Sequence, residues 1–193
     1  RGLIPPRQSK ASRCSRRPAE KQEIGFGLVT ADSARRRACV LTVSDRAAQG
    51  VYADESGPAA AQALVDLGFE VVETAIVQDG NGVASQLRTW VAGEIPLVIT
   101  TGGTGLSPRD LTPEQTRLVI DRKIPGIAER VRSFSVEKVP AAVLSRGIAG
   151  SAGRTLIVNL PGSVGGARDG VAALAEVLGH AVDQLGDGGH GSH

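Results

Sequence analysis

The sequence predicts an α/β domain of three layers, with helices on both faces of a parallel sheet. Short apolar runs rich in Val, Ile and Leu alternate along the chain with stretches whose apolar residues recur at helical spacing. Polar or glycine-rich segments follow most of these runs, as expected where parallel strands end at a ligand-binding edge. Aromatic residues make up only 3% of the 193 residues, so the core must consist of Val, Leu, Ile and Ala.

The first 37 residues differ from the rest of the chain in charge. They hold ten Lys or Arg and three Asp or Glu, a net charge of +7, whereas the remaining 156 residues carry −5. This composition predicts a basic, disordered extension (residues 1–37), then one folded domain (38–186) and a flexible Gly/His tail (187–193). The extension lacks the apolar core of a signal peptide, and no run of about 18 apolar residues occurs, so we expect no membrane contact. We also expect no nucleic-acid binding, because the domain lacks a basic face with interleaved aromatics.

Two strand–helix units are predicted in the first half of the domain. Residues 38–43 form an apolar run that predicts a buried strand, and the polar segment after it leads to a helix over residues 58–67. Gly68 follows the last apolar position of this helix and ends it. Residues 69–77 predict the second strand, and residues 82–93 the second helix.

A third strand over residues 97–100 leads into a glycine-rich loop, Thr101–Gly105. The next helix is predicted to begin at Thr112, with this residue as the N-cap and Pro113 at the first helical position. A strand, a glycine loop and a helix start together offer backbone N–H groups to an anion. The carboxylate of Asp110 in the same segment indicates a phosphate together with Mg²⁺. The segment is neither a Walker loop nor a dinucleotide fingerprint, and a tight structural turn is the alternative interpretation.

The last third of the domain predicts one more strand among helices. The helix from Thr112 extends to residue 120, and a further helix begins at Pro125 and is broken at Val139–Pro140. The apolar run over residues 155–160 predicts the last strand. Residues 166–185 predict one final amphipathic helix.

Several polar residues follow the ends of these strands. Right-handed crossovers place the carboxyl ends of parallel strands at one edge of the sheet, so Ser44, Asp79 and Asp110 should lie close together there. Two carboxylates and the phosphate oxygens of a ligand suit Mg²⁺. Each acid also has a structural interpretation: Asp79 as a turn residue, Asp110 as the lead into the next helix, and Asp54 as an acid at a helix start.

Cysteine and histidine chemistry is excluded by position. Cys39 opens an apolar strand and Cys14 lies in the basic extension, which fits a reducing compartment and a cytoplasmic protein. The three histidines, His180, His190 and His193, lie late in the chain and make neither a zinc site nor a hydrolase triad. Phosphoryl or nucleotidyl transfer remains compatible, because it needs positioning, amide donors and a metal rather than a protein nucleophile.

Six segments resemble the molybdenum-cofactor biosynthesis family, which includes the Mog-type molybdopterin adenylyltransferases, the MoaB proteins and the G domains of gephyrin and its plant counterpart. They occur in the order and spacing of that family and cover nearly all of the domain. The six segments are Val43–Arg46, Gly50–Pro58, Gln78–Asp79, Thr100–Glu114, Leu144–Gly147 and Thr155–Gly162.

The resemblance implies Mg²⁺-dependent transfer of AMP from ATP to the terminal phosphate of molybdopterin, with release of pyrophosphate. Asp79 and Asp110 would then be the catalytic and metal-binding acids. The remaining site residues would bind the substrates and their phosphates. The glycine-loop residues for phosphate are Thr101, Gly102, Gly103, Thr104 and Gly105. Ser44 and Asp54 would line the nucleotide side, and Ser145 and Asn159 the pterin side or its junction with the nucleotide.

The resemblance also implies a three-layer α/β/α sandwich whose mainly parallel, mixed sheet contains one antiparallel strand, assembled as a homotrimer. The product would pass to a molybdate-inserting enzyme. One segment departs from the family: many adenylyltransferases have a Pro-Lys pair after the last strand, where this chain has Ser163–Gly170. The role of that lysine is vacant here or is taken by Arg168, and Arg replaces a point charge imperfectly. A non-catalytic pterin-binding or carrier protein of the MoaB kind is therefore the alternative.

Overall fold

The computed structural model describes residue 2 and residues 36–187, and the expectations for the N-terminal extension, Cys14, His190 and His193 lie outside this part. The described chain contains a six-stranded sheet with the strand order β2-β1-β3-β6-β5-β4. Its strands are β1 (Arg37–Val43), β2 (Glu70–Val77), β3 (Leu97–Thr101), β4 (Arg122–Lys123), β5 (Ala149–Ala152) and β6 (Thr155–Leu160).

The sheet is mixed rather than wholly parallel. Strands β2, β1, β3 and β6 pair in parallel, whereas β5 pairs antiparallel with both β6 and β4. The prediction of a wholly parallel sheet, which came from the alternation of strands and helices, is therefore wrong at β5. The single antiparallel strand that the family resemblance implied is confirmed. In the centre of the sheet, Thr100 of β3 lies opposite Asn159 of β6.

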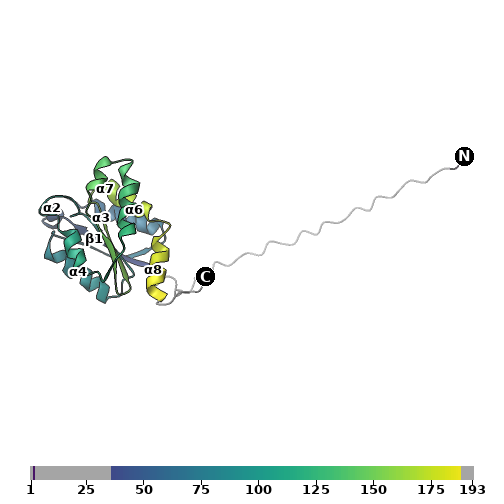
Figure 1. The fold of residues 1–193 in the computed structure, drawn as a ribbon, viewed down its shortest axis with the longest axis horizontal. Helices are drawn as coiled ribbons and strands as arrows, with labels where there is room; N and C mark the ends of the chain where they lie inside the picture. The colour runs from purple at the N-terminus through teal and green to yellow at the C-terminus, as the bar shows by residue number, and fades with distance from the viewer. Residues whose placement is uncertain (1, 3–35, 188–193) are drawn as a thin grey trace.

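Helices cover both faces of the sheet, as predicted (Figure 1). α3, α6, α7 and α8 pack on one face, and α4 packs on the other. The helices are α2 (Asp45–Ala48), α3 (Ser56–Asp66), α4 (Asn81–Ala92), α5 (Thr112–Arg117), α6 (Pro125–Val136), the 3₁₀ helix η1 (Pro140–Leu144), α7 (Val164–Ala173) and α8 (Leu178–Asp187).

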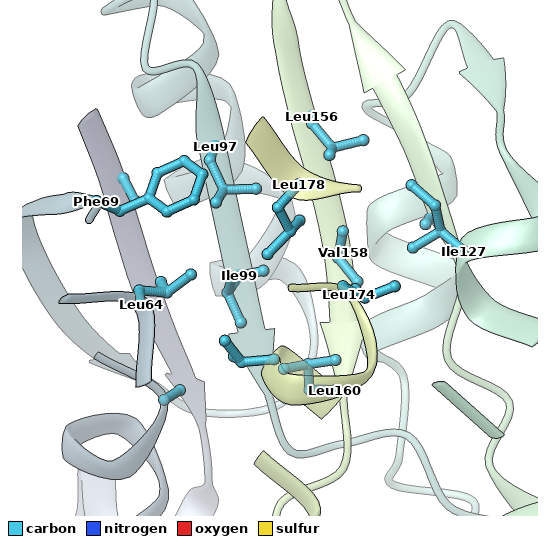
Figure 2. Packing of buried hydrophobic residues seen from close by; sticks show 14 of the residues in the cluster. Leu64, Phe69, Leu97, Ile99, Ile127, Leu156, Val158, Leu160, Leu174 and Leu178 are labelled. Carbon is cyan, nitrogen blue, oxygen red and sulfur yellow. The ribbon is translucent and has the colours of Figure 1, made fainter. Parts of the chain in front are cut away.

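The strands divide their buried side chains between two cores, because successive residues of a strand point to opposite faces. Leu97 and Ile99 of β3 lie in the core under α3, α6, α7 and α8, while Val98 between them lies in the core under α4. In Figure 2, Ile99 and Val158 from neighbouring strands lie close to Leu174 and Leu178. This double burial makes the central strands rigid supports for the loops at their ends.

Two helix predictions differ from the structure. α5 ends at Arg117 rather than at residue 120, because the chain then pairs with β5 through an Asp121 N–H that donates to Ser151 O at 2.7 Å. The predicted single C-terminal helix is two helices, α7 and α8, separated by turns. Leu174 and Leu178 on either side of this break are both fully buried, and the break lets both reach the sheet.

No helix in residues 36–187 is both long enough and apolar enough to cross a membrane.

Candidate functional site

The carboxyl ends of β1, β2 and β3 surround a polar hollow of about 410 Å³, here called the first hollow. Both predicted acids and Ser44 reach it, together with part of the glycine loop. Its walls are Val43, Ser44, Asp45, Arg46, Tyr52, Ser56, Asp79, Gly102, Gly103, Ser107, Arg109, Asp110 and Gly162. The convergence expected from parallel strand order is therefore present.

Hydrogen bonds connect the two acidic loops to each other. Asp79 Oδ1 accepts from the backbone N–H of Leu111 at 3.0 Å, and Asp110 Oδ2 accepts from the N–H of Ser107 at 2.9 Å. The Asp79 N–H in turn donates to Asp45 Oδ1 at 3.1 Å. The loop after β2 is thus attached both to the glycine-rich segment and to the end of β1.

Partial burial raises the pKa of Asp79 above its ordinary value of 3.8. The backbone N–H groups of Leu111 and Gly80 act in the opposite direction, and the negative charges of Asp110 and Asp45 raise the pKa further. Three carboxylates around one hollow repel one another, so a bound cation would lower the energy of this arrangement.

Backbone packing fixes the glycine loop in place. Gly102 has φ 101° and Gly103 has φ 61°, values that side chains rarely adopt. A Cβ atom on Gly102 would lie 2.2 Å from Val43 O, and one on Gly103 would lie 2.2 Å from both Asp79 Oδ2 and Thr112 Oγ1. Only glycine fits at these two positions, and the two oxygens line the space directly beside Gly103.

The amide groups of the loop are not all available to a ligand. The Gly102 N–H donates to Leu160 O at 3.2 Å, so this amide is part of the fold. The N–H groups of Gly103, Thr104 and Gly105 make no hydrogen bond within residues 36–187. The predicted anion-binding amides are therefore reduced to these three.

A second hollow of about 570 Å³ lies on the other side of the glycine loop. It shares four residues with the first hollow, Gly102, Gly103, Asp110 and Gly162. Its other walls come from α6, η1 and α7 and the loops beside them: Thr104, Gly105, Ser135, Lys138, Val139, Ala141, Ala142, Leu144, Ser145, Pro161, Ser163, Gly165, Gly166 and Asp169. Two ligands could therefore meet across one loop.

Arg146 holds this shared loop, and the sequence analysis gave it no role. Its Nε donates to Gly105 O at 2.7 Å, its other guanidinium nitrogens donate to Asp110 O and Glu114 Oε1, and its backbone N–H donates to Thr104 O at 2.9 Å. A charged planar fork of this kind orders several acceptors at once. The one signal in the sequence was its place between Ser145 and Gly147 in a family-like segment.

Three of the predicted ligand-binding residues line neither hollow. Asp54 Oδ1 accepts from the Ser56 and Gly57 N–H groups at 3.0 and 3.1 Å, and Asp54 Oδ2 accepts from Thr42 Oγ1 at 2.6 Å. Asp54 therefore connects the start of α3 to β1, in agreement with its alternative interpretation as an acid at the start of a helix. Asp54 thus has an internal structural role, and it lines neither hollow.

Thr101 and Asn159 are also turned into the protein. Thr101 Oγ1 donates to Pro161 O at 2.8 Å. Asn159 Nδ2 donates to Thr100 Oγ1 at 2.9 Å and to Thr116 Oγ1 at 3.0 Å. Both residues are at least 98% buried, and their side chains bond to the strands and the helix around the glycine loop. Ser44 and Ser145, by contrast, line the first and the second hollow respectively.

The start of α5 differs from its prediction by one position. Leu111 is the N-cap, and Thr112 lies in the first turn without a capping hydrogen bond. Its hydroxyl is fully buried and has no hydrogen-bond partner. A buried polar atom of this kind next to Asp79 Oδ2 is a sign of a missing polar group in the site.

Asp79 and Asp110 alone are too few to hold a metal ion, so a cation here would also need the phosphate oxygens of a bound ligand. Within the described residues no group of three or more His, Cys, Asp or Glu is arranged to hold a metal ion. Mg²⁺ is commonly bound by one or two carboxylates and substrate phosphates, with water completing the shell. Asp79 and Asp110, the unpartnered Thr112 hydroxyl and the crowded negative charge fit this type of binding.

The positive charge in the second hollow comes from Lys138, after the end of α6, and not from α7. Arg168 is exposed and lines neither hollow, so it does not take the role of the missing lysine. Lys138, just after α6, lines the second hollow, where its Nζ lies 2.9 Å from Asp169 Oδ1 and 5.3 Å from the centre of the Phe134 ring. Sequence reasoning missed Lys138 because it lies far from Ser163–Gly170 in the chain.

Cys39 and His180 take no part in the site. Burial raises the pKa of the Cys39 thiol to about 11, so it is protonated and unreactive at neutral pH. His180 is an exposed residue of α8.

A family model described as a probable molybdopterin binding domain matches residues 39–180. The molybdopterin adenylyltransferase of Helicobacter pylori strain J99 is 38% identical over 150 residues, which are 76% of this chain and 85% of that protein. The molybdenum cofactor synthesis protein cinnamon of Drosophila melanogaster is 36% identical over 151 residues. This match covers 77% of the chain but only 25% of the fly protein.

Two solved structures have the same fold. The molybdopterin biosynthesis Mog protein from Mycobacterium ulcerans superposes with a TM-score of 0.74 at 53% identity, over 78% of this chain and 99% of that one. The molybdopterin biosynthesis enzyme MoaB from Thermus thermophilus superposes with a TM-score of 0.74 at 44% identity, over 77% and 95%. Proteins with both names are thus similar to this chain.

Proposed function

Because the chain belongs to the molybdenum cofactor biosynthesis family, we propose that it is a molybdopterin adenylyltransferase. In this reaction the terminal phosphate of molybdopterin attacks the α-phosphorus of ATP. A new phosphorus–oxygen bond forms, the bond to the β-phosphate breaks, and pyrophosphate leaves. The H. pylori relative, similar over most of its length, carries this name.

The observation that carries the proposal is the wall common to the two hollows. Gly102, Gly103, Asp110 and Gly162 border both spaces, so ligands bound on either side would present their phosphates to the same loop. A transfer between two phosphate-bearing substrates needs this kind of juxtaposition, because most of the rate enhancement comes from position and charge.

In the first hollow the residues suit a nucleotide triphosphate. The N–H group of Gly103 and the guanidinium of Arg109 would bind phosphate oxygens here, and the N–H groups of Thr104 and Gly105 would bind phosphate oxygens from the side of the second hollow. Asp79 and Asp110 would hold Mg²⁺, which when bound neutralises the charge that develops on the phosphates. Arg146 keeps the loop in shape but faces backbone and Glu114, so it positions the site and does not contact substrate.

The second hollow suits the pterin. Val139, Ala142 and Leu144 offer an apolar surface to a flat ring, and Ser145 offers a hydroxyl. Lys138 would attract the phosphate of the pterin substrate. These assignments are supported by the composition of the walls.

The experiment is pyrophosphate release by the purified protein with Mg²⁺, ATP and molybdopterin. We expect release to require both substrates and to stop when EDTA removes the metal. Omission of ATP or of molybdopterin provides the matched controls. Binding of molybdopterin without any turnover would contradict the proposal.

A non-catalytic pterin-binding protein of the MoaB kind is the second candidate. The absence of a lysine from residues 163–170 and the similarity to MoaB from T. thermophilus support it. Calorimetry with molybdopterin, with and without ATP, separates the two functions. Tight pterin binding that is indifferent to ATP favours the carrier, whereas ATP-dependent release of pyrophosphate excludes it.

The proposal includes a homotrimer in the cytoplasm that delivers its product to a molybdate-inserting enzyme. Sedimentation at several concentrations tests the trimer, and a monomer at all of them would contradict it. Transfer of adenylylated pterin to a partner is tested by adding molybdate and the inserting enzyme to the product.

A further inference from the structure

Tyr52 is the only tyrosine of the chain, and it borders the first hollow with 49% of its surface exposed. Nothing in the proposed chemistry uses it so far. It lies in the loop between α2 and α3, on the same hollow as Arg46 and Arg109. A half-exposed aromatic ring beside charged groups in a hollow is a candidate contact for a ligand.

The loop that carries the ring is folded back on α2. The Gly50 N–H donates to Ala47 O at 3.0 Å, and the Val51 N–H donates to Arg46 O at 2.9 Å. This turn places Tyr52 against the side chain of Arg46, whose guanidinium carbon lies 5.2 Å from the ring centre. A cation at this distance from the ring centre is favourable and holds the ring in orientation.

We propose that Tyr52, held by Arg46, is the surface on which the base of the nucleotide stacks; this inference rests on the proposed function. The ring touches a cation and still exposes half of its surface, so a second planar group has room against it. The base belongs on this side because Arg109, Gly103 and both acids line the same hollow as Tyr52. The apolar surface that suits the pterin lies across the loop.

Stacking makes a specific prediction about selectivity. A base stacked on an aromatic ring gains about 1–3 kcal/mol in a way that tolerates any base. Tyr52→Ala should therefore weaken the binding of ATP and of GTP by a similar factor, about 5- to 150-fold. Inorganic triphosphate, which has no base, should bind the variant as it binds the unchanged protein.

The test is calorimetry of ATP, GTP and triphosphate with the full chain and three variants. Tyr52→Phe keeps the ring and should keep the affinity. Val65→Ala is the matched control, because Val65 is also 49% exposed but lines neither hollow. Equal affinity of Tyr52→Ala and the unchanged protein for ATP would overturn the proposal.

A second measurement needs no variant. Protein labelled on tyrosine shows a single ring by NMR, because the chain has one tyrosine. We expect ATP to shift its ring resonances strongly and triphosphate to shift them little. If ATP binds and the ring does not respond, the stacking proposal fails while the adenylyltransferase survives. If the unchanged protein binds no ATP at all, the proposed function fails.

Discussion

The two hollows on either side of the glycine loop differ sharply in their walls. The first is bordered by five charged residues, Asp45, Arg46, Asp79, Arg109 and Asp110. The second is bordered by three charged residues, Asp110, Lys138 and Asp169, and by the apolar residues Val139, Ala141, Ala142 and Leu144. One loop thus separates a space suited to phosphates and a cation from a space suited to a flat ring. Variants that affect one side, the other or both test this division.

The largest effect is expected from the shared acid. Asp110→Asn should lower turnover at least about a hundredfold, because it removes a carboxylate that would hold Mg²⁺ where both hollows meet, and the metal would neutralise the charge that develops on the phosphates. The rate of pyrophosphate release measures it. Asp66→Asn on the exposed side of α3 is the control and should leave the rate unchanged. An unchanged rate in Asp110→Asn would remove this acid from the mechanism.

Gly103→Ala should impair both hollows at once. The new Cβ would lie 2.2 Å from Asp79 Oδ2 and Thr112 Oγ1 at a φ of 61°, so the loop must shift and lose about 1–3 kcal/mol of stability. Calorimetry should show weaker binding of both ATP and molybdopterin. Gly126→Ala in α6, where a Cβ meets nothing within 4 Å, is the control. Loss of only one ligand would show that the two sites do not share this wall.

Leu144→Glu should affect the second hollow alone. A new negative charge on its wall repels an anionic pterin, so we expect at least about tenfold weaker molybdopterin binding with ATP affinity unchanged. Val143→Glu places the same charge on the neighbouring residue, which is 64% exposed and lines neither hollow. If both variants lose affinity equally, general charge rather than the hollow is responsible.

The smallest effect concerns stability. The fold raises the pKa of Asp79, which means that the ionised carboxylate is less favourable in the folded protein than in the unfolded chain. This lowers the free energy of unfolding at a pH above the raised pKa. The loss disappears below the ordinary value of 3.8, where the group is protonated in both states. Asp79→Asn, without ligands, should therefore raise the melting temperature slightly at pH 7, and the gain should vanish as the pH falls towards 3.8. A variant that melts earlier at pH 7 would show that the hydrogen bond from Leu111 outweighs the charge.

The sequence predicted best those strands and helices in which apolar residues form a run or recur at a regular spacing. The run from Thr155 to Leu160 is wholly buried and forms β6 as expected. β5 was missed because its residues, Ala149–Ala152, have little strand preference. Gly150 is needed there because a Cβ would lie 2.5 Å from Arg122 O. That requirement arises from the partner strand and leaves no local pattern.

The candidate site was predictable in position but not in detail. Because parallel strands end at one edge of the sheet, Asp79 and Asp110 were expected to lie close together, and both line the first hollow. Which polar side chains face a hollow and which bond inside the protein could not be predicted from the sequence. Asn159 and Thr101 form hydrogen bonds with neighbours that are about 60 residues away in the chain. The same is true of Arg146, whose partners Gly105 and Glu114 precede it by more than 30 residues.

The contacts of Arg146 have a consequence for the order in which the chain is made. A nascent polypeptide that ends near residue 140 already contains both carboxylates and the whole glycine loop. It contains neither the guanidinium that holds Gly105 nor the β6 carbonyl that receives the Gly102 N–H. Activity should therefore arise only once the last third of the domain has left the ribosome. A separately supplied fragment from residue 141 onward should be required to restore a truncated protein.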